Sequence, residues 1–253
     1  MFDLKSISRT RRLEAPKILL AGEPKIGKST FAASAPNAIG IVTEDGLAGV
    51  DAQAFPLAQS LGDVYSAIGT LLNEPHEFET VFIDSLDWLE PLLHRHVAAA
   101  NGWKDIESPG YGKGYIAAAA EWKNLLDGLE ALRRERGMGV VLICHVKQKR
   151  IESPTHEGYD AWVLKLHDRA AALVSEWADI CAYAAHRIAI KTTEAGFGQK
   201  ENKAKSLGER VLHMDPHPAY PSGSRFGLHD CPLSWSAFAD QLTQAQAPQP
   251  LAA

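Results

Sequence analysis

Residues 22–29, with the sequence GEPKIGKS, are the feature that most constrains what this chain can fold into. They satisfy the pattern G-x-x-x-x-G-K-[S/T], whose glycines let the backbone wrap closely enough for its N–H groups to bind phosphate oxygens. An apolar run at residues 17–21 precedes the pattern, and a helix is expected to begin at about Lys28. This strand–loop–helix context is the one that the pattern requires, so the sequence predicts a phosphate-binding loop.

The predicted ligands of this loop are ATP and Mg²⁺. Lys28 is expected to contact the β- and γ-phosphates, and the hydroxyl of Ser29 is expected to bind Mg²⁺. The N-terminus of the following helix adds the positive end of its dipole. The residues predicted to bind the nucleotide are Gly22, Glu23, Pro24, Lys25, Ile26, Gly27, Lys28, Ser29 and Thr30.

Another apolar run, TVFID at residues 80–84, ends on an acid. Open α/β sheets bind their ligands at the carboxyl ends of the strands, so Asp84 is expected to hold Mg²⁺ together with Ser29. The alternative is an ordinary acid that caps the helix after the strand.

Two more expected strands end on polar side chains. Glu44 follows the run IGIVT and is expected to orient the attacking water as a general base, whereas Asp45 with Gly46 is typical of a turn. His145 follows the run GVVLIC and is expected to sense the γ-phosphate. The alternatives are a turn acid at Glu44 and, at His145, a histidine that bonds a backbone carbonyl.

Apolar runs that alternate with helical segments predict an α/β fold, in which a mostly parallel sheet is covered by helices on both faces. An antiparallel hairpin is expected near the C-terminus. The expected elements are helices at 62–74, 116–136 and 163–178, a helix after Ser85 that Pro91 breaks or kinks, loops at 101–114 and 147–162, a strand at 179–184, and hairpin strands at 186–193 and 209–214.

The length of 253 residues suits one such domain, expected at residues 16–240 between a basic N-terminal arm at 1–15 and a disordered tail at 241–253. The net charge is −5, so any contact with nucleic acid must come from local patches. The three cysteines form no CxxC pair, which argues against a disulfide framework. Without an apolar run of membrane-spanning length or a signal-peptide pattern, the chain is expected to be cytoplasmic and away from membranes.

The segments TEDGLAGVD, VFIDSLDWLEP and LICHVKQKRI occur in the order found in the RecA recombinase core, which they resemble. The chain is more closely similar to the small phage-encoded RecA-like ATPases, which keep this P-loop NTPase core and lack the flanking domains of RecA. The resemblance covers residues 16–230 approximately. It implies a RecA-like core, binding of single-stranded DNA, a homo-oligomeric ring or filament, and a role in single-strand annealing and phage homologous recombination in the host cytoplasm. A single-strand-binding protein is a further implied partner.

Two departures from these families bear on the site. RecA carries glutamine at the sensor position, where this chain has His145. The annealing ATPases often have a lysine shortly before a late Arg-Phe pair, whereas the sequence here is PSGSRF. Arg225 alone is therefore the candidate to reach the nucleotide of a neighbouring subunit.

The resemblance also implies that the loops after the third and fourth strands face DNA. Aromatic side chains there would stack on bases, and cationic side chains would contact phosphates. The alternative is a pair of solvated surface loops, because nearby acids nearly cancel the charge of the second one. The predicted DNA-contacting residues are Trp103, Lys104, Tyr111 and Lys113 in the first loop, and Lys147, Lys149 and Arg150 in the second.

The first functional hypothesis is a DNA-stimulated ATPase that binds single-stranded DNA and promotes annealing or strand exchange. One alternative is an ATP-switched DNA-binding scaffold with little turnover. Another is a small-molecule phosphotransferase, although no compact lid is apparent in the sequence. A zinc site is disfavoured, because the spacing of its potential ligands matches no standard zinc motif. Those residues are His213, His217, His229 and Cys231.

Overall fold

The computed structural model describes residues 14–154, 157–195 and 199–246. Most of the predicted N-terminal arm (1–13) and the end of the predicted tail (247–253) lie outside the described residues. The elements in chain order are β1 Lys17–Gly22, α1 Lys28–Ala33, β2 Ala38–Val42, β3 Gln53–Ala54, α2 Leu61–Asn73, β4 Thr80–Asp84, α3 Leu86–Ala100, α4 Lys113–Arg136, β5 Gly139–Ile151, β6 Tyr159–Leu164, α5 Asp168–Trp177, β7 Ile180–Ala195, β8 Gln199–His213, β9 Gly223–Ser224, β10 Cys231–Pro232 and α6 Trp235–Gln246.

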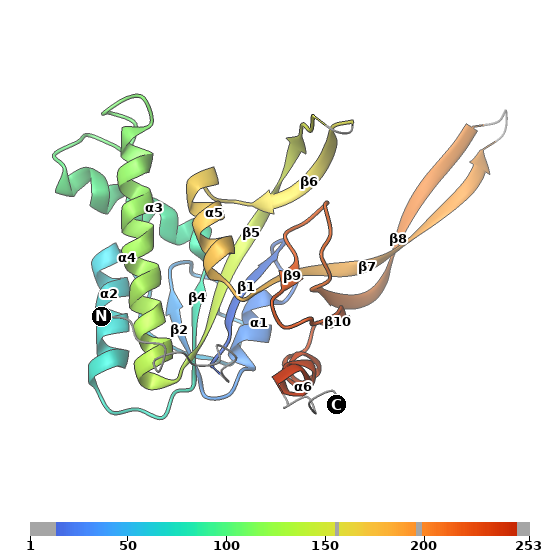
Figure 1. Cartoon of the computed structure of the whole chain (residues 1–253). Coiled ribbons are helices and arrows are strands. Elements are labelled where there is room, and N and C mark those ends of the chain that lie inside the picture. The colour runs from blue at the N-terminus through green and yellow to red at the C-terminus, as the bar shows by residue number, and fades with distance from the viewer. Residues whose placement is uncertain (1–13, 155–156, 196–198, 247–253) are drawn as a thin grey trace, which may run out of the picture.

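The strands form a mixed sheet whose central part is parallel (Figure 1). Its parallel strands lie in the order β7-β1-β5-β4-β2-β3, and β8 and β10 extend it antiparallel beyond β7. The phosphate-loop strand β1 therefore lies between β7 and β5, while the Asp84 strand β4 is one strand further along. The predicted α/β fold with a mostly parallel sheet and a C-terminal antiparallel hairpin is confirmed.

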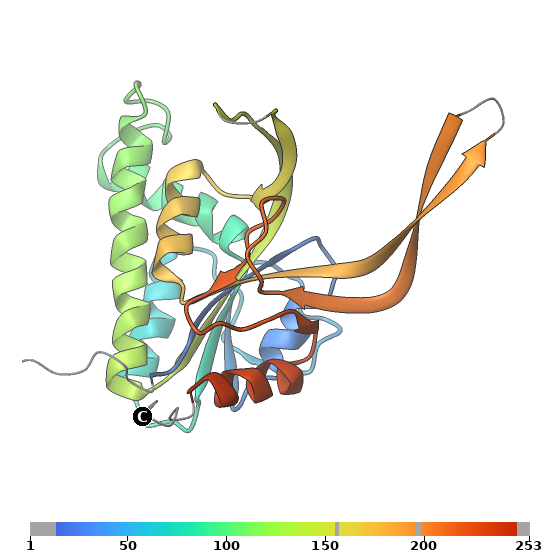
Figure 2. The same cartoon turned by 45° about the vertical axis from the view of Figure 1, so that its right-hand side comes forward.

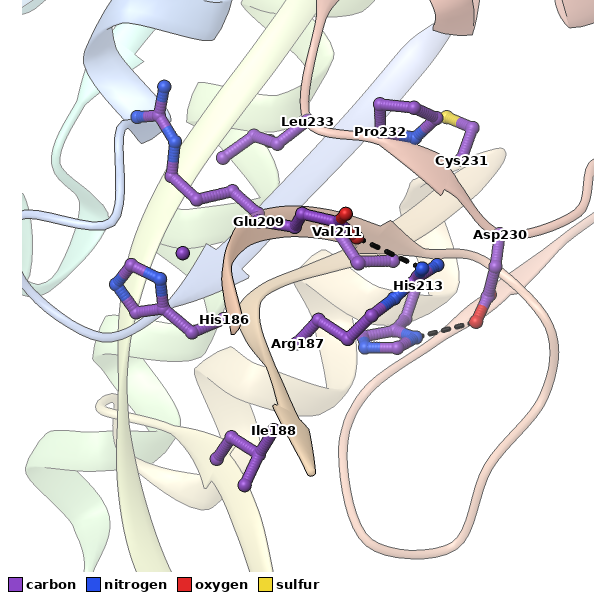
Figure 3. Close-up of a pocket in the computed structure, with 12 residues that line it drawn as sticks. His186, Arg187, Ile188, Glu209, Val211, His213, Asp230, Cys231, Pro232 and Leu233 are labelled. Atoms are coloured by element: carbon purple, nitrogen blue, oxygen red, sulfur yellow. Dashed lines mark hydrogen bonds and ion pairs between the residues drawn. The ribbon is translucent and has the colours of Figure 1, made fainter. Parts of the chain in front are cut away.

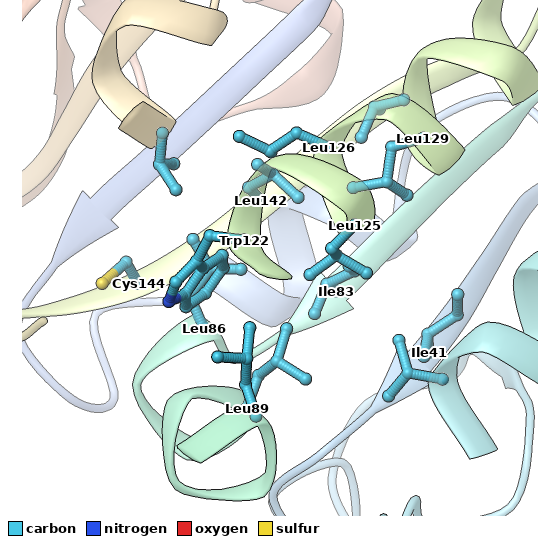
Figure 4. Close-up of a cluster of buried hydrophobic side chains, with 14 of the residues drawn as sticks. Ile41, Ile83, Leu86, Leu89, Trp122, Leu125, Leu126, Leu129, Leu142 and Cys144 are labelled. Atoms are coloured by element: carbon cyan, nitrogen blue, oxygen red, sulfur yellow. The ribbon is translucent and has the colours of Figure 1, made fainter. Parts of the chain in front are cut away.

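Helices cover both faces of the sheet, because the buried strands alternate apolar side chains between two cores. On β4, Val81 and Ile83 belong to the core under α2, α3, α4 and α5, whereas Phe82 belongs to the core under α1 and α6. Figure 4 shows the first core, where Trp122 and Leu125 of α4 pack against β4 and β5. The two layers fix the strand ends that carry the polar residues.

The predicted loop at 147–162 is wrong. β5 continues through Ile151 and pairs antiparallel with β6, so this stretch is a β-hairpin. The predicted helix at 163–178 is accordingly shorter, beginning at Asp168 of α5 after the end of β6. The expected strands at 179–184 and 186–193 are one continuous strand, β7, whose long hairpin with β8 projects from the body in both views (Figures 1 and 2).

Two further corrections concern helices. α3 continues through Pro91 to Ala100, so the proline does not end it. α6 was not expected, and it makes residues 241–246 helical where the sequence predicted a disordered tail. Phe238 of α6 is fully buried and packs on Phe31 of α1, with ring centroids 5.8 Å apart. In the part of the chain that the structure describes, no helix is both long enough and apolar enough to cross a bilayer.

Candidate functional site

The loop between β1 and α1 has the close backbone packing that its glycines predict. A Cβ atom at Gly22 would lie 2.7 Å from the carbonyl oxygen of Ala184 on β7, so only glycine fits there. Gly27 has a φ of 109°, in the region that favours glycine, and a Cβ atom there would lie 2.4 Å from Nη1 of Arg210. Both glycines of the motif are therefore required by this structure.

The side chain of Lys28 lies inside the loop. Its ammonium donates to the carbonyl oxygens of Gly22 and Glu23, at 3.0 and 2.8 Å. Burial lowers the pKa of Lys28, while the nearby carboxylates of Asp84 and Asp87 oppose that shift. A bound phosphate would add negative charge and favour the ammonium form.

Ser29 of α1 and Asp84 of β4 come together although β1, the strand that precedes α1, and β4 are not neighbours in the sheet. The Ser29 side chain hydrogen-bonds the Asp84 carboxylate, which is almost completely buried. Burial raises the pKa of Asp84, against the opposing effects of Ser29 and of the Lys28 charge. A hydroxyl beside a carboxylate supplies the hard oxygen ligands that Mg²⁺ prefers, with phosphate oxygens and water to complete its shell, so this pair fits the predicted metal.

Glu44 lies beside this pair. Backbone bonds hold the end of β2 against the end of β4: the N–H groups of Thr43 and Glu44 both donate to the carbonyl oxygen of Asp84, at 2.8 and 3.3 Å. Oε2 of Glu44 accepts a hydrogen bond from Oγ of Ser85 at 3.3 Å and lies 4.0 Å from Nδ1 of His145. Asp45, in contrast, is exposed in a bend.

His145 is not at the end of its strand, as the sequence predicted, but in the middle of β5. It pairs with Gly22 of β1, at the level where the parallel sheet ends, and β5 then continues into the hairpin with β6. Its ring is 13% exposed and Nδ1 lies 3.0 Å from Oδ1 of Asp87. The sensor candidate is thus part of the strand that forms the hairpin.

Asp87 is a site residue that the sequence reading missed. Its side chain is 1% exposed and accepts from Nδ1 and the backbone N–H of His145, from Oγ of Ser85 at 2.9 Å, and from Nζ of Lys165 at 3.3 Å. Burial alone would raise the pKa of Asp87, but the hydrogen bond and charge of His145 hold it well below its usual range. In the sequence, Asp87 is typical of an acid in the first turn of a helix.

Arg210 was also missed. It lies on β8, and its Nη1 donates to the carbonyl oxygen of Ile26 in the phosphate loop at 3.2 Å. Their separation of 184 residues leaves no local pattern that would reveal the contact.

The first group of predicted DNA-contacting residues lies between α3 and α4. Lys104 is exposed, Tyr111 is fully exposed, and Lys113 is the first residue of α4. Trp103 is half-buried and packs against the core, which makes its indole less available for stacking than the sequence suggested. In both views this connection and the β5–β6 hairpin project to the same side of the molecule (Figures 1 and 2).

The second group lies on the β5 strand of that hairpin, and each of its cations has a protein partner. Nζ of Lys147 donates to a backbone carbonyl of the β6–α5 connection at 3.2 Å. Lys149 pairs with Asp168 at 2.8 Å, and Nη1 of Arg150 lies 3.7 Å from Oδ1 of Asp160. A DNA phosphate would have to compete with these contacts.

Arg225 is not brought to this chain's own phosphate loop. It bonds Oδ1 of Asp179 at 2.8 Å, and the backbone N–H of Asp179 donates to the carbonyl oxygen of Lys17 at the opposite end of β1. Two of the potential zinc ligands are likewise paired with carboxylates, His213 with Asp230 and His229 with Asp215. Within the described ranges no three histidine, cysteine or acidic residues cluster as a metal site.

A family model described as an AAA domain matches residues 14–226, which is most of the chain. No curated protein matches it. Among solved structures, the crystal structure of the RadB recombinase aligns with 83% of this chain and 86% of its own, at 16% sequence identity and a TM-score of 0.45. The match to the family model, together with the phosphate loop and the strand ends beside it, makes this chain a member of the AAA-domain family and a nucleotide-binding P-loop protein.

Proposed function

We propose that the protein is an ATPase that hydrolyses Mg²⁺-bound ATP at this site and couples hydrolysis to the binding of single-stranded DNA, in support of annealing or strand exchange. Lys28 neutralises the β- and γ-phosphates. Ser29 and Asp84 would hold the metal ion, which when bound would supply the positive charge that polarises the γ-phosphate. Glu44 orients the attacking water as general base.

The observation that carries the proposal is the grouping of Glu44, Ser85 and His145 around Ser29 and the buried Asp84. The Glu44 carboxylate is only 30% exposed and lies beside Ser85 and His145, a position suited to a group that orients water and accepts a proton from it. Because Asp87 accepts the hydrogen of Nδ1, the other ring nitrogen of His145, Nε2, would donate to a γ-phosphate oxygen when the ring is in its imidazolium form.

The proposed coupling to DNA uses the continuity of β5. His145 and the cations Lys147, Lys149 and Arg150 lie on one strand, so a contact between His145 and the γ-phosphate would bias the position of the hairpin. Lys104 is exposed in the connection between α3 and α4, which projects to the same side as the hairpin, and it would add a phosphate contact.

The test is ATP hydrolysis with and without single-stranded DNA at low salt, with Lys28→Ala as the control. The proposal expects turnover that rises with DNA and that is lost in the Lys28→Ala variant. Turnover that does not respond to DNA over a range of lengths would contradict the coupling, and a phosphorylated acceptor in place of released phosphate would indicate a phosphotransferase instead.

The alternative of an ATP-switched scaffold is favoured by the same continuity of β5, because binding alone would move the hairpin. Glu44→Gln separates the two functions. A scaffold keeps ATP-dependent annealing in this variant, whereas a machine driven by turnover loses it.

A further inference from the structure

Arg210 of β8 contacts the phosphate loop at a point where the loop has no side chain. Its Nη1 donates to the carbonyl oxygen of Ile26 at 3.2 Å. The guanidinium also fills the space beside Gly27, where a Cβ atom would lie 2.4 Å from Nη1 and 3.6 Å from a methyl carbon of Leu233. Arg210 is therefore packed against the peptide unit between Ile26 and Gly27 as well as bonded to it.

A β-bulge precedes Arg210 on β8. Arg210 pairs with His186 of β7, and the next pair along the hairpin is Ser206 with Ile188. Between these two pairs β8 has three residues, 207–209, where β7 has one. A bulge increases the local twist and re-aims the side chains beside it, and bulges are common next to active sites. The side chain that follows this bulge is the one that reaches the phosphate loop.

The bond from Arg210 fixes the orientation of this peptide unit. A peptide unit is planar and trans, so its carbonyl oxygen and its N–H group point in opposite directions. Arg210 approaches from β8, outside the loop, and holds the carbonyl of Ile26 outward. The N–H of Gly27 therefore points into the loop, the side on which the ammonium of Lys28 lies.

Glycine makes this unit easy to turn over. Gly27 has a φ of 109°, and glycine adopts positive and negative φ about equally readily. If the unit turned over, the carbonyl oxygen of Ile26 would point into the loop and repel a phosphate, and the N–H would point away from it. The helical bond from Phe31 fixes the next carbonyl, that of Gly27, at 3.0 Å. The carbonyl of Ile26 is held from β8 by Arg210, whose charge strengthens the hydrogen bond.

We propose that Arg210 is a positioning residue, which aims the N–H of Gly27 at the nucleotide by holding the carbonyl of Ile26. This inference rests on the proposed nucleotide site. The backbone N–H groups of such a loop bind the α- and β-phosphates, which ADP carries as well as ATP. Arg210 therefore contributes to the binding of both nucleotides, and it does so through the backbone of the loop rather than by contact with the reacting atoms.

Arg187 supplies the matched control. Figure 3 shows it in the hollow at the base of the β7–β8 hairpin, where it pairs with Glu209 at 3.0 Å. Arg187 and Arg210 both line this hollow and both are exposed. Arg187, however, pairs with an acid of the hairpin, whereas Arg210 donates to the phosphate loop.

The experiment measures ADP affinity by calorimetric titration and the NMR signal of the Gly27 amide with and without ADP, both in the presence of Mg²⁺. Arg210→Met keeps an apolar stem but has no donor. Arg210→Lys keeps a charged donor without the planar fork of the guanidinium. Thermal melting checks that these variants and Arg187→Met are folded, and ATP turnover gives kcat and KM for each.

In the wild type, the Gly27 amide signal is expected to move when ADP binds. Arg210→Met is expected to bind ADP about tenfold more weakly, the loss of one good contact, and to show a smaller movement of that signal. Its kcat at saturating ATP should stay within about threefold of the wild type while KM rises. Arg210→Lys should recover part of the affinity, and Arg187→Met should match the wild type in every measurement.

Unchanged ADP affinity and an unchanged Gly27 signal in folded Arg210→Met would overturn the inference. A fall in kcat with unchanged KM would also overturn it, because Arg210 would then act on the transition state. An equal loss of affinity in Arg187→Met would show that the charge at the base of the hairpin matters rather than the bond to Ile26. A wild-type protein that binds no nucleotide would instead refute the proposed nucleotide site itself, and with it this inference.

Discussion

Asp87→Asn is the substitution whose effect follows most directly from the geometry of the site. The carboxylate accepts hydrogen bonds from four donors, two on His145, one on Ser85 and one on Lys165. An asparagine keeps one acceptor oxygen and turns an NH₂ group toward the remaining donors. At least two charge-assisted hydrogen bonds are therefore lost in a position that is closed to water.

Hydrogen bonds to charged groups contribute about 1.5–3 kcal/mol each, and partial relaxation recovers some of that. We expect Asp87→Asn to lower the free energy of unfolding by about 3 kcal/mol at neutral pH. The pKa of Asp87 is depressed in the folded state, so its stabilisation is complete above the ordinary aspartate value of about 4 and is lost as the pH falls through the depressed value. The difference between wild type and variant should therefore be constant near neutrality and shrink in acid.

Urea unfolding across this pH range is the assay, and Asp168→Asn is the matched control. Asp168 is also an acid in the first turn of a helix, but its side chain is 75% exposed and it pairs with the partly exposed Lys149. Its loss should cost no more than about 0.5 kcal/mol. A cost for Asp87→Asn as small as that of the control, or a difference that grows as the pH falls, would refute the reasoning.

Two other substitutions test the loop and the core. Gly27→Ala should weaken ATP binding at least about tenfold, because Gly27 has a positive φ and the new methyl group would collide with Arg210. Gly112→Ala, with a φ of 68° and open space for the methyl group, should leave ATP binding unchanged and lower the free energy of unfolding by about 1–2 kcal/mol. Calorimetric titration measures the ATP affinities and urea unfolding the stabilities, and equal ATP affinities in both variants would contradict the steric argument. Trp122→Ala should lower the free energy of unfolding by about 3–5 kcal/mol, because the indole is buried between α4 and the sheet. Trp88→Ala, at a 52% exposed position, should lower it by less than about 0.5 kcal/mol. Similar midpoints of urea unfolding for the two variants would exclude the packing shown in Figure 4.

The parts of the structure that the sequence predicted well depend on contiguous residues. The phosphate loop is encoded by residues 22–29, and the buried strands by short apolar runs such as TVFID. Because the carboxyl ends of parallel strands meet at one edge of the sheet, Glu44, Asp84 and His145 were expected together, and the structure brings them together.

The parts that it missed depend on contacts between distant segments. Arg210 reaches Ile26 from far along the chain, and nothing around it in the sequence indicates that contact. The β5–β6 hairpin is not evident from the sequence because residues 147–150, KQKR, are polar and lack the apolar alternation of a half-buried strand. The residues Trp235, Phe238 and Leu242 of α6 are three and four positions apart, a spacing in the sequence that is typical of one face of a helix.

The turnover and the ATP affinity of Glu44→Gln test most directly whether Glu44 is the general base of an ATP-hydrolysing site. Glutamine keeps the shape of the side chain and an acceptor for Ser85, but it cannot take a proton from water. We expect turnover to fall at least about 100-fold, while the dissociation constant for ATP changes no more than about threefold. Turnover within about threefold of the wild type would contradict it.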